Sequence, residues 1–169
     1  QSVSQLFEGP YSGNPEAAAR RCLNSHNDWA GIEPDEKNLR VVRSVESPGG
    51  YHVTLERYIG EVPVYPGNLV VSFDREMYAH FYFSSLYLFT EKVSTAAGLS
   101  VADAEREATA YLQPADDKAI FGPESELVVW AGDNRDFALC WRVRVNYTDP
   151  AGDWEVIVDA ASGQIRRAI

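Results

Sequence analysis

The residues best suited to acid–base or metal chemistry are scattered along the sequence. The three histidines, His26, His52 and His80, fall on three separate predicted elements. No HExxH or HxxEH spacing places two of them on one helical turn, where zinc would need them. Because an isolated histidine is more often structural than reactive, we predict no catalytic residue and no metal ligand in this chain.

Short motifs of cofactor and nucleophile sites are also missing from the sequence. It contains no GxSxG, GxxxxGK[ST] or GxGxxG, so nothing supports a hydrolase elbow, a phosphate-binding loop or a dinucleotide fold. Acidic clusters at Asp116-Asp117, residues 133–136 and residues 149–153 could bind calcium, but they lack the alternating spacing of an EF-hand loop. We interpret them as solvated turns, since aspartate caps its own turn, and we expect no cofactor.

The two cysteines permit at most one internal disulfide. Cys22 falls in a predicted helix and Cys140 in a predicted strand, both among apolar neighbours. Free cysteine in such places commonly behaves as a small buried hydrophobe. We favour two buried thiols and leave a bridge as the alternative.

Length and charge limit the class of the protein and its partners. With 169 residues, 45% of them hydrophobic, the chain can form one globular domain or two small ones. Its net charge of −10 has the wrong sign for binding phosphates or an anionic membrane surface. No apolar run approaches the roughly 20 residues that span a bilayer, and residues 1–5 do not resemble an export signal. We expect neither nucleic acid nor membrane as a partner.

Two helices are predicted from their first residues. Asn14 followed by Pro15 begins the first helix, which should end near Asp28, and Ser100 with Asp103 three residues later begins the second. Apolar faces at helical spacing are predicted at Ala19, Cys22, Leu23 and His26 in the first helix, and at Val101, Ala104, Ala108, Tyr111 and Leu112 in the second.

Strands follow each helix. Period-two alternation and turn residues predict strands at 39–44, 51–59, 69–73 and 78–89, then at 126–130, 137–147, 154–159 and 164–168. A helix followed by strands thus occurs twice. We predict an α+β protein of two tandem modules, residues 1–91 and 92–169, each a helix packed on a curved antiparallel sheet in a cystatin-like arrangement.

The most specific stretch is the run HVTLERYIGEVPVYPG at residues 52–67. It resembles the fungalysin/thermolysin propeptide (FTP) family, which has a histidine-led strand, a glycine, a Val-Pro-Val step and a further glycine. The matching residues are His52, Gly60, Val62, Pro63, Val64 and Gly67, and Gly31 with residues 39–42 is similar to the family's first helix-to-strand connection.

The second half resembles a PepSY domain. Leu99 and Ser100 precede an alanine-rich helix, and the run 154–165 contains Asp159 and Gly163. We expect the residues that carry both resemblances to shape the fold, with Gly60 and Gly67 in turns that need positive φ and Gly163 in the tight turn before the last strand. None of them, His52 and Asp159 included, is expected to be catalytic.

Together the two modules resemble the pro-region of secreted thermolysin-like zinc proteases. The resemblance implies a propeptide that acts as intramolecular chaperone and inhibitor of a cognate protease catalytic domain, in a secreted or periplasmic location. The chain's end is expected to enter the active cleft like a cleaved product, with an ordinary frayed terminus as the alternative. This tail comprises Ile165, Arg166, Arg167, Ala168 and Ile169.

Two other functions stay open at the level of sequence. The chain could be a freestanding secreted or envelope module that inhibits proteases encoded elsewhere. It could also be an enzyme in which the helix and sheet enclose a pocket containing an acid or base, for instance Asp159 or His52.

Overall fold

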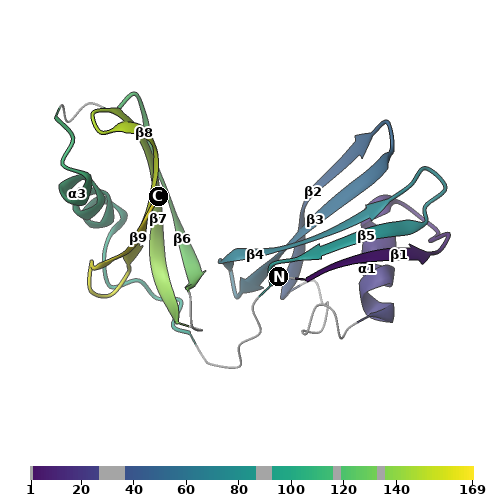
Figure 1. Cartoon of the computed structure of the whole chain (residues 1–169). Coiled ribbons are helices and arrows are strands. Elements are labelled where there is room, and N and C mark those ends of the chain that lie inside the picture. The colour runs from purple at the N-terminus through teal and green to yellow at the C-terminus, as the bar shows by residue number, and fades with distance from the viewer. Residues whose placement is uncertain (1, 27–36, 87–92, 116–118, 133–135) are drawn as a thin grey trace. The chain divides into compact units, whose positions relative to one another are not determined.

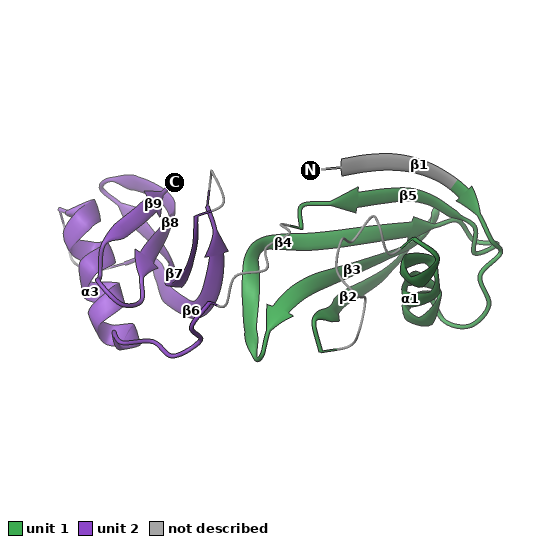
Figure 2. Ribbon diagram, turned by 90° about the horizontal axis from the view of Figure 1, so that it is seen from below, with its two compact units in different colours: residues 1–90 green, residues 91–169 purple. Residues whose placement is uncertain are grey.

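The computed structural model of the chain describes residues 2–26, 37–86, 93–115, 119–132 and 136–169 (Figure 1). The chain divides into two compact units, Gln1–Thr90 and Glu91–Ile169 (Figure 2). Each unit has a helix and an antiparallel sheet, so the predicted α+β class is confirmed. In the described part of the chain, no helix is long and apolar enough to cross a membrane. The predictions at Asp28, Gly31, Asp116-Asp117 and Asp133 fall outside the described residues.

Within the described residues, unit 1 consists of one helix and five antiparallel strands in the order β2-β3-β4-β5-β1. Helix α1 lies on one face of this sheet (Figure 2). The elements are β1 (Ser2–Glu8), α1 (Pro15–Ser25), β2 (Leu39–Ser47), β3 (Gly50–Ile59), β4 (Val62–Phe73) and β5 (Ala79–Ser84).

Helix α1 begins as its sequence predicts. The Asn14 side chain accepts a hydrogen bond from Ala17 N–H at 2.8 Å, which satisfies one of the free donors of the first turn. The helix ends earlier than expected, at Ser25, with His26 as C-cap. Its buried face packs on alternate residues of the sheet, and the core comprises Ala18, Ala19, Cys22, Leu23, Leu39, Val53, Leu55, Leu69, Val71, Phe73, Ala79 and Tyr82.

Three strand predictions in unit 1 need correction. The first element of the structure is β1, which was not predicted from the sequence. It pairs with β5, far along the chain. Gly67, where a turn was predicted, lies within β4, at an irregularity where the register with β3 shifts between Pro63 and Asn68. Strand β5 ends at Ser84, although apolar residues continue after it.

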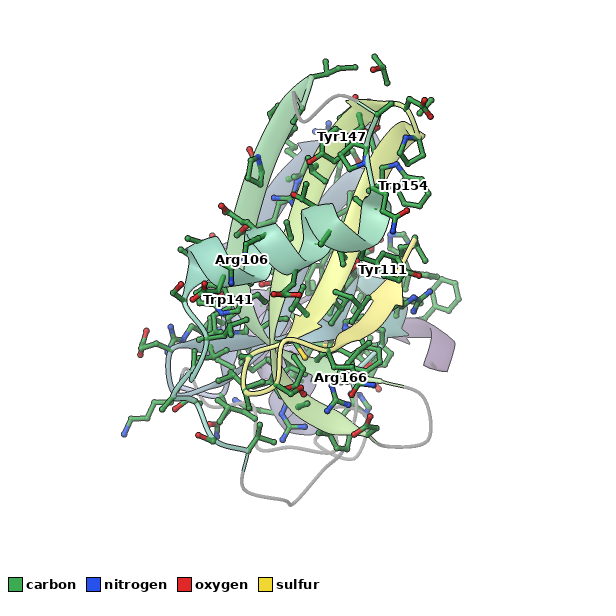
Figure 3. All side chains as sticks on the ribbon, turned by 90° about the vertical axis from the view of Figure 1, so that its left-hand side faces the viewer. Arg106, Tyr111, Trp141, Tyr147, Trp154 and Arg166 are labelled. Atoms are coloured by element: carbon green, nitrogen blue, oxygen red, sulfur yellow. The ribbon has the colours of Figure 1, made fainter. Side chains whose placement is uncertain are left out.

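Unit 2 places helix α3 against the antiparallel strands β6-β7-β8-β9 (Figure 3). The Ser100 hydroxyl accepts a hydrogen bond from Asp103 N–H at 3.2 Å, as the predicted cap requires. It also donates to the Asp103 carboxylate at 2.6 Å. The elements are α3 (Val101–Leu112), β6 (Phe121–Ala131), β7 (Phe137–Thr148), β8 (Ala151–Asp159) and β9 (Ile165–Ala168).

The apolar face of α3 is narrower than its spacing predicts. Ala104, Ala108 and Leu112 are buried, but Val101 is 40% exposed and Tyr111 is 56% exposed. The buried residues recur every four positions, so they form a single stripe against the sheet. The prediction that Val101 and Tyr111 share this face is wrong.

Both cysteines are buried free thiols, as favoured from the sequence. Burial raises the pKa of Cys22 and raises the pKa of Cys140 to about 12. A thiol reacts as its thiolate, so we expect neither cysteine of the folded protein to react with Ellman's reagent at pH 8. Two equivalents should react after unfolding in urea, and an exposed control, Thr148→Cys, should react at once. Rapid labelling of either native cysteine would contradict the burial.

Candidate functional site

The residues singled out from the sequence gather in two places. His52, Gly60, Pro63, Val64 and Gly67 belong to the β3–β4 hairpin of unit 1. In unit 2, Asp159 and Gly163 adjoin the tail at the β8–β9 connection. The structure thus brings Asp159 and Arg166 together, a contact that the spacing of the residues does not reveal.

The side chain of His52 connects three segments of unit 1. Its Nδ1 lies 2.9 Å from the Ser72 hydroxyl on β4, and its Nε2 lies 3.1 Å from the Ser47 hydroxyl at the end of β2. Because Ser47 donates its proton to Gly50 C=O, it accepts from His52 Nε2, which leaves Nδ1 to accept from Ser72. Both ring nitrogens are engaged within the protein, as expected of a structural histidine.

Two adjacent hollows flank His52 on the sheet face that carries its side chain. One has a volume of about 470 Å³ and is lined by Val70, Ser72, His80 and Phe81. The other has a volume of about 220 Å³ and is lined by Arg43, Val45 and Thr54. Among these described lining residues there is no carboxylate. The hollows form a shallow, mainly apolar surface with two imidazoles and one guanidinium.

The motif residues after His52 have backbone roles. Gly60 forms the turn between β3 and β4 with φ +59°, as predicted. Pro63 is the second residue of β4, where its missing N–H is tolerated, and Val64 is buried. The prediction of positive φ at Gly67 is wrong, since its φ lies outside that region. A Cβ at this position would instead lie 2.4 Å from the carbonyl oxygen of Val64. Gly67 is therefore required by close backbone approach.

Asp159 organises the connection from β8 to β9. Its Oδ1 accepts from the N–H groups of Ala161 and Ser162 at 3.0 and 2.9 Å, and its Oδ2 accepts from Arg166 at 2.7 and 2.9 Å. Burial raises the pKa of Asp159, but these hydrogen bonds outweigh it and lower the pKa to about 2. Gly163 completes the turn with φ +77°. As expected, Asp159 and Gly163 shape the turn before the last strand.

The predicted tail is part of the sheet. Residues 165–168 form β9 against β8, and Ile169 exchanges two backbone hydrogen bonds with Glu155. Arg166 also contacts Asp136 at the start of β7. Arg167 and Ile169 are exposed. Entry of these residues into an active cleft stays a prediction, and it would require β9 to leave β8.

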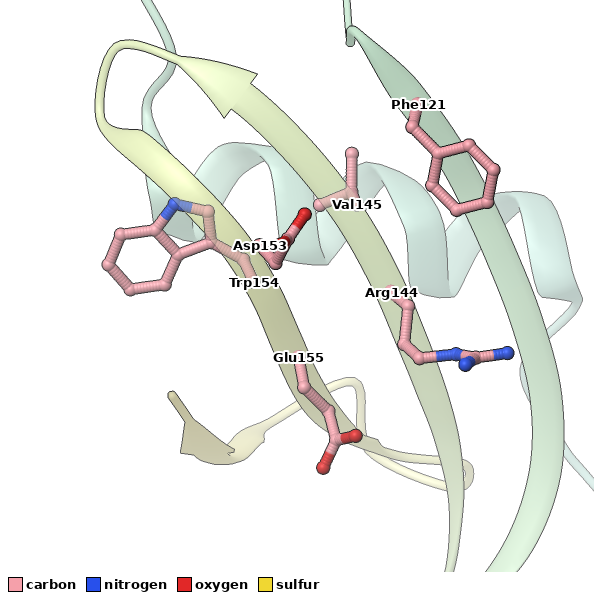
Figure 4. A pocket seen from close by; sticks show the side chains of 6 residues that line it. All are labelled: Phe121, Arg144, Val145, Asp153, Trp154 and Glu155. Carbon is pink, nitrogen blue, oxygen red and sulfur yellow. The ribbon is translucent and has the colours of Figure 1, made fainter.

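A third hollow, of about 310 Å³, lies on unit 2 and was not foreseen from the sequence (Figure 4). Its lining residues are Phe121, Arg144, Val145, Asp153, Trp154 and Glu155. The charged side chains have partners: Arg144 donates to Glu124 at 2.9 Å, Glu155 accepts from Arg142 at 2.7 Å, and Asp153 accepts from the Asn146 amide. The sequence signal that points to this face is the pair of arginines at alternate positions of β7, Arg142 and Arg144.

A cluster of polar side chains joins the first strand of unit 1 to the end of its helix. Glu8 lies 2.6 Å from His26 Nε2 and accepts from the Tyr11 hydroxyl at 3.0 Å. The hydrogen bond from His26 lowers the pKa of Glu8, with a further contribution from Tyr11 against the effect of burial. The cluster positions β1 and was not expected from the sequence.

Comparison with known proteins gives one weak structural match. No protein-family model matches the sequence, and no curated protein matches it. Among solved structures, the Bacillus megaterium YpeB C-terminal domain is similar with a TM-score of 0.48 and 12% sequence identity. The alignment covers 98% of this chain and 68% of that chain. At a TM-score of 0.48, this match supports no conclusion about the family, activity or partner of this chain.

Proposed function

We propose that this chain is a noncatalytic pro-region module that folds and inhibits a thermolysin-like zinc peptidase. The proposal rests on the run at residues 52–67, whose matching positions all lie in one hairpin, β3–β4. In that hairpin glycine is needed at Gly60 because φ is positive, and at Gly67 because the backbone of Val64 approaches too closely for a side chain. A resemblance carried by residues with such separate physical roles is more specific than one of composition.

The proposed mechanism is binding without turnover. His52 has hydroxyl partners on both ring nitrogens, and Asp159 is surrounded by donors that hold it as a carboxylate. Neither arrangement leaves a proton acceptor aimed at a substrate, which favours a rigid scaffold over the enzyme alternative. A scaffold of this kind would stabilise the folding transition state of its partner and then cover its cleft. A partner of this class implies that the chain is secreted or periplasmic, because the peptidases that it would serve are secreted.

The experiment that tests the proposal is refolding of the cognate peptidase. The denatured catalytic domain is diluted with and without an equimolar amount of this chain, and the recovered activity is measured after the chain is digested. We expect at least a tenfold higher yield with the chain, and inhibition when the chain is titrated onto the mature enzyme. Equal yields together with no inhibition would remove the proposal, whereas inhibition without assisted refolding would favour a freestanding inhibitor.

The contribution of the tail can be tested without deleting β9. Ile169 is 54% exposed at the end of the tail, and Tyr111 is 56% exposed on α3. The substitutions Ile169→Asp and Tyr111→Asp therefore place the same charge at equally exposed sites. If the tail enters the cleft, only Ile169→Asp should weaken inhibition, by about tenfold for the loss of one buried apolar side chain. Equal inhibition by both variants would show that another surface covers the cleft.

A further inference from the structure

The sheet of unit 1 has one face packed on helix α1 and a second face whose residues alternate with those of the core (Figure 2). Strand register places the residues of this second face in two rows that cross β2, β3, β4 and β5 in turn. The first row is Val45, His52, Ser72 and Phe81, and the second is Arg43, Thr54, Val70 and Phe83. We call these eight residues the outer face of unit 1.

The outer face is accessible along most of its length. Arg43 and His52 are exposed, and Phe81 is 36% exposed. The two hollows that flank His52, of about 470 and 220 Å³, both lie on this face and share His52 in their lining, so they form one continuous surface. A continuous exposed surface that contains aromatic side chains is typical of a binding site.

The chemistry of the outer face changes from one side to the other. Val70, Phe81 and Phe83 make its β4–β5 side apolar. Arg43, Thr54 and His52 make its β2–β3 side polar. The face therefore suits a partner with an apolar stripe that is bordered by polar groups on one side.

The charge of the outer face is opposite to that of the whole chain. The chain has a net charge of −10, but none of the eight residues is acidic. Arg40, on the same strand as Arg43, is paired with Glu61. Among the residues that the structure describes, no carboxylate lies within ion-pair distance of Arg43. The charge of Arg43 is thus left to attract a carboxylate from outside this part of the chain.

The width of the outer face fits a helix. Neighbouring strands lie about 4.8 Å apart, so four strands span about 14 Å. An α-helix with its side chains is about 10–12 Å wide, and α1 already packs on the opposite face of the same sheet (Figure 2). A small molecule fits less well, because a hollow this shallow would leave much of its surface in water.

We propose that the outer face of unit 1 binds an acidic amphipathic helix of a second protein. The apolar stripe of the helix would pack on Val70, Phe81 and Phe83, and carboxylates at the border of the stripe would reach Arg43. A second copy of this chain fits less well, because both described helices, α1 and α3, already bury their apolar stripes in their own units. The inference goes beyond the proposed function, since it holds whether or not the partner is a peptidase.

The test is an NMR titration of the ¹⁵N-labelled chain with three blocked peptides of about 18 residues, long enough to form a helix. The first peptide has Leu at helical spacing bordered by Glu, the second has Gln in place of each Glu, and the third has the first composition in an order that breaks the stripe. We expect the first peptide to shift the amides of the outer face with a Kd of about 0.1 mM, because small interfaces bind weakly. The second should bind about threefold more weakly, and the third should not bind.

Two variants separate the apolar side of the face from its charge. Phe81→Ser should weaken binding of the Glu peptide about tenfold, the effect of one partly buried aromatic side chain. Arg43→Gln should weaken it about threefold, but should leave binding of the Gln peptide unchanged, because the charge pair is then already absent.

Each variant has a matched control elsewhere in the chain. Phe121→Ser removes an aromatic side chain that is 55% exposed on unit 2, and Arg21→Gln removes an exposed guanidinium from α1. Both controls should bind the Glu peptide as the wild type does. Circular dichroism confirms that each variant is folded.

Four results would overturn the proposal. An absence of shifts with the Glu peptide at about 1 mM would remove binding at this face. Equal binding of the Glu and Gln peptides would remove the acidic partner. An equal loss of binding in Phe121→Ser and Phe81→Ser would place the contact elsewhere. Shifts of the outer face that depend on protein concentration without any peptide would show that a second copy occupies it.

Discussion

Replacing Asp159 with Ala is expected to destabilise unit 2 by about 3 kcal/mol, the usual cost of removing one partner from a buried ion pair. The substitution leaves Arg166 without its main carboxylate and frees the N–H groups of Ala161 and Ser162 at the turn. Urea unfolding followed by tryptophan fluorescence measures the effect, because Trp130, Trp141 and Trp154 all belong to unit 2. A loss below 1 kcal/mol would mean that the cluster contributes little to stability.

The same carboxylate predicts how stability depends on pH. The pKa of Asp159 falls from 3.8 to about 2 on folding, because hydrogen bonds from the turn and from Arg166 outweigh burial. A lowered pKa contributes stability that is complete above the unfolded value and is lost as pH falls through the folded value. The contribution is about 2 kcal/mol, and it should disappear between pH 4 and pH 2.

Comparison with Asp159→Asn isolates this contribution from other carboxylates. The difference in unfolding free energy between wild type and Asp159→Asn should be largest near pH 5 and should shrink toward pH 2. Asp153→Asn is the exposed control, and its difference from wild type should be small. A difference for Asp159→Asn that stays constant from pH 5 to pH 2 would contradict the ionised, donor-surrounded carboxylate.

Local features of the fold could be predicted because their causes are local. Asn14 and Ser100 each cap a helix through a hydrogen bond within three residues. The width of a buried helix face could not be predicted in this way, because it depends on the sheet against which the helix packs. Tyr111 has the spacing of a core residue but lies beside the covered stripe. Helical spacing predicts the direction in which a side chain points around the helix axis, but it does not predict how far that side chain is buried.

Features that depend on distant partners could not be predicted. Strand β1 has weak alternation, and its Phe7 is 85% exposed, so only its pairing with β5 makes it a strand. The contact between Asp159 and Arg166 needs the turn that brings β9 back along β8. Each of these requires strand register, which a single sequence with irregular alternation does not supply.

Gly67 is another residue whose surroundings could not be predicted from the sequence, and substituting it should strongly reduce stability. Its place in the resemblance to the propeptide family suggested a turn, but the structure puts it inside β4 with no room for a side chain. An added Cβ would lie 2.4 Å from Val64 C=O and 3.2 Å from the Val64 Cβ. Both atoms belong to Val64, which is buried, so neither can move without disturbing the packing around it.

Gly67→Ala should therefore cost about 3 kcal/mol of stability in unit 1, at the upper end of overpacking effects. Gly60→Ala is the matched control, because its Cβ would meet nothing within 4 Å and only its φ of +59° is unfavourable. That backbone strain amounts to about 1 kcal/mol. Urea unfolding followed by circular dichroism compares the two variants. If Gly60→Ala costs more than Gly67→Ala, conformational strain and not close approach explains the glycines of this hairpin, and the structural basis of the resemblance changes with it.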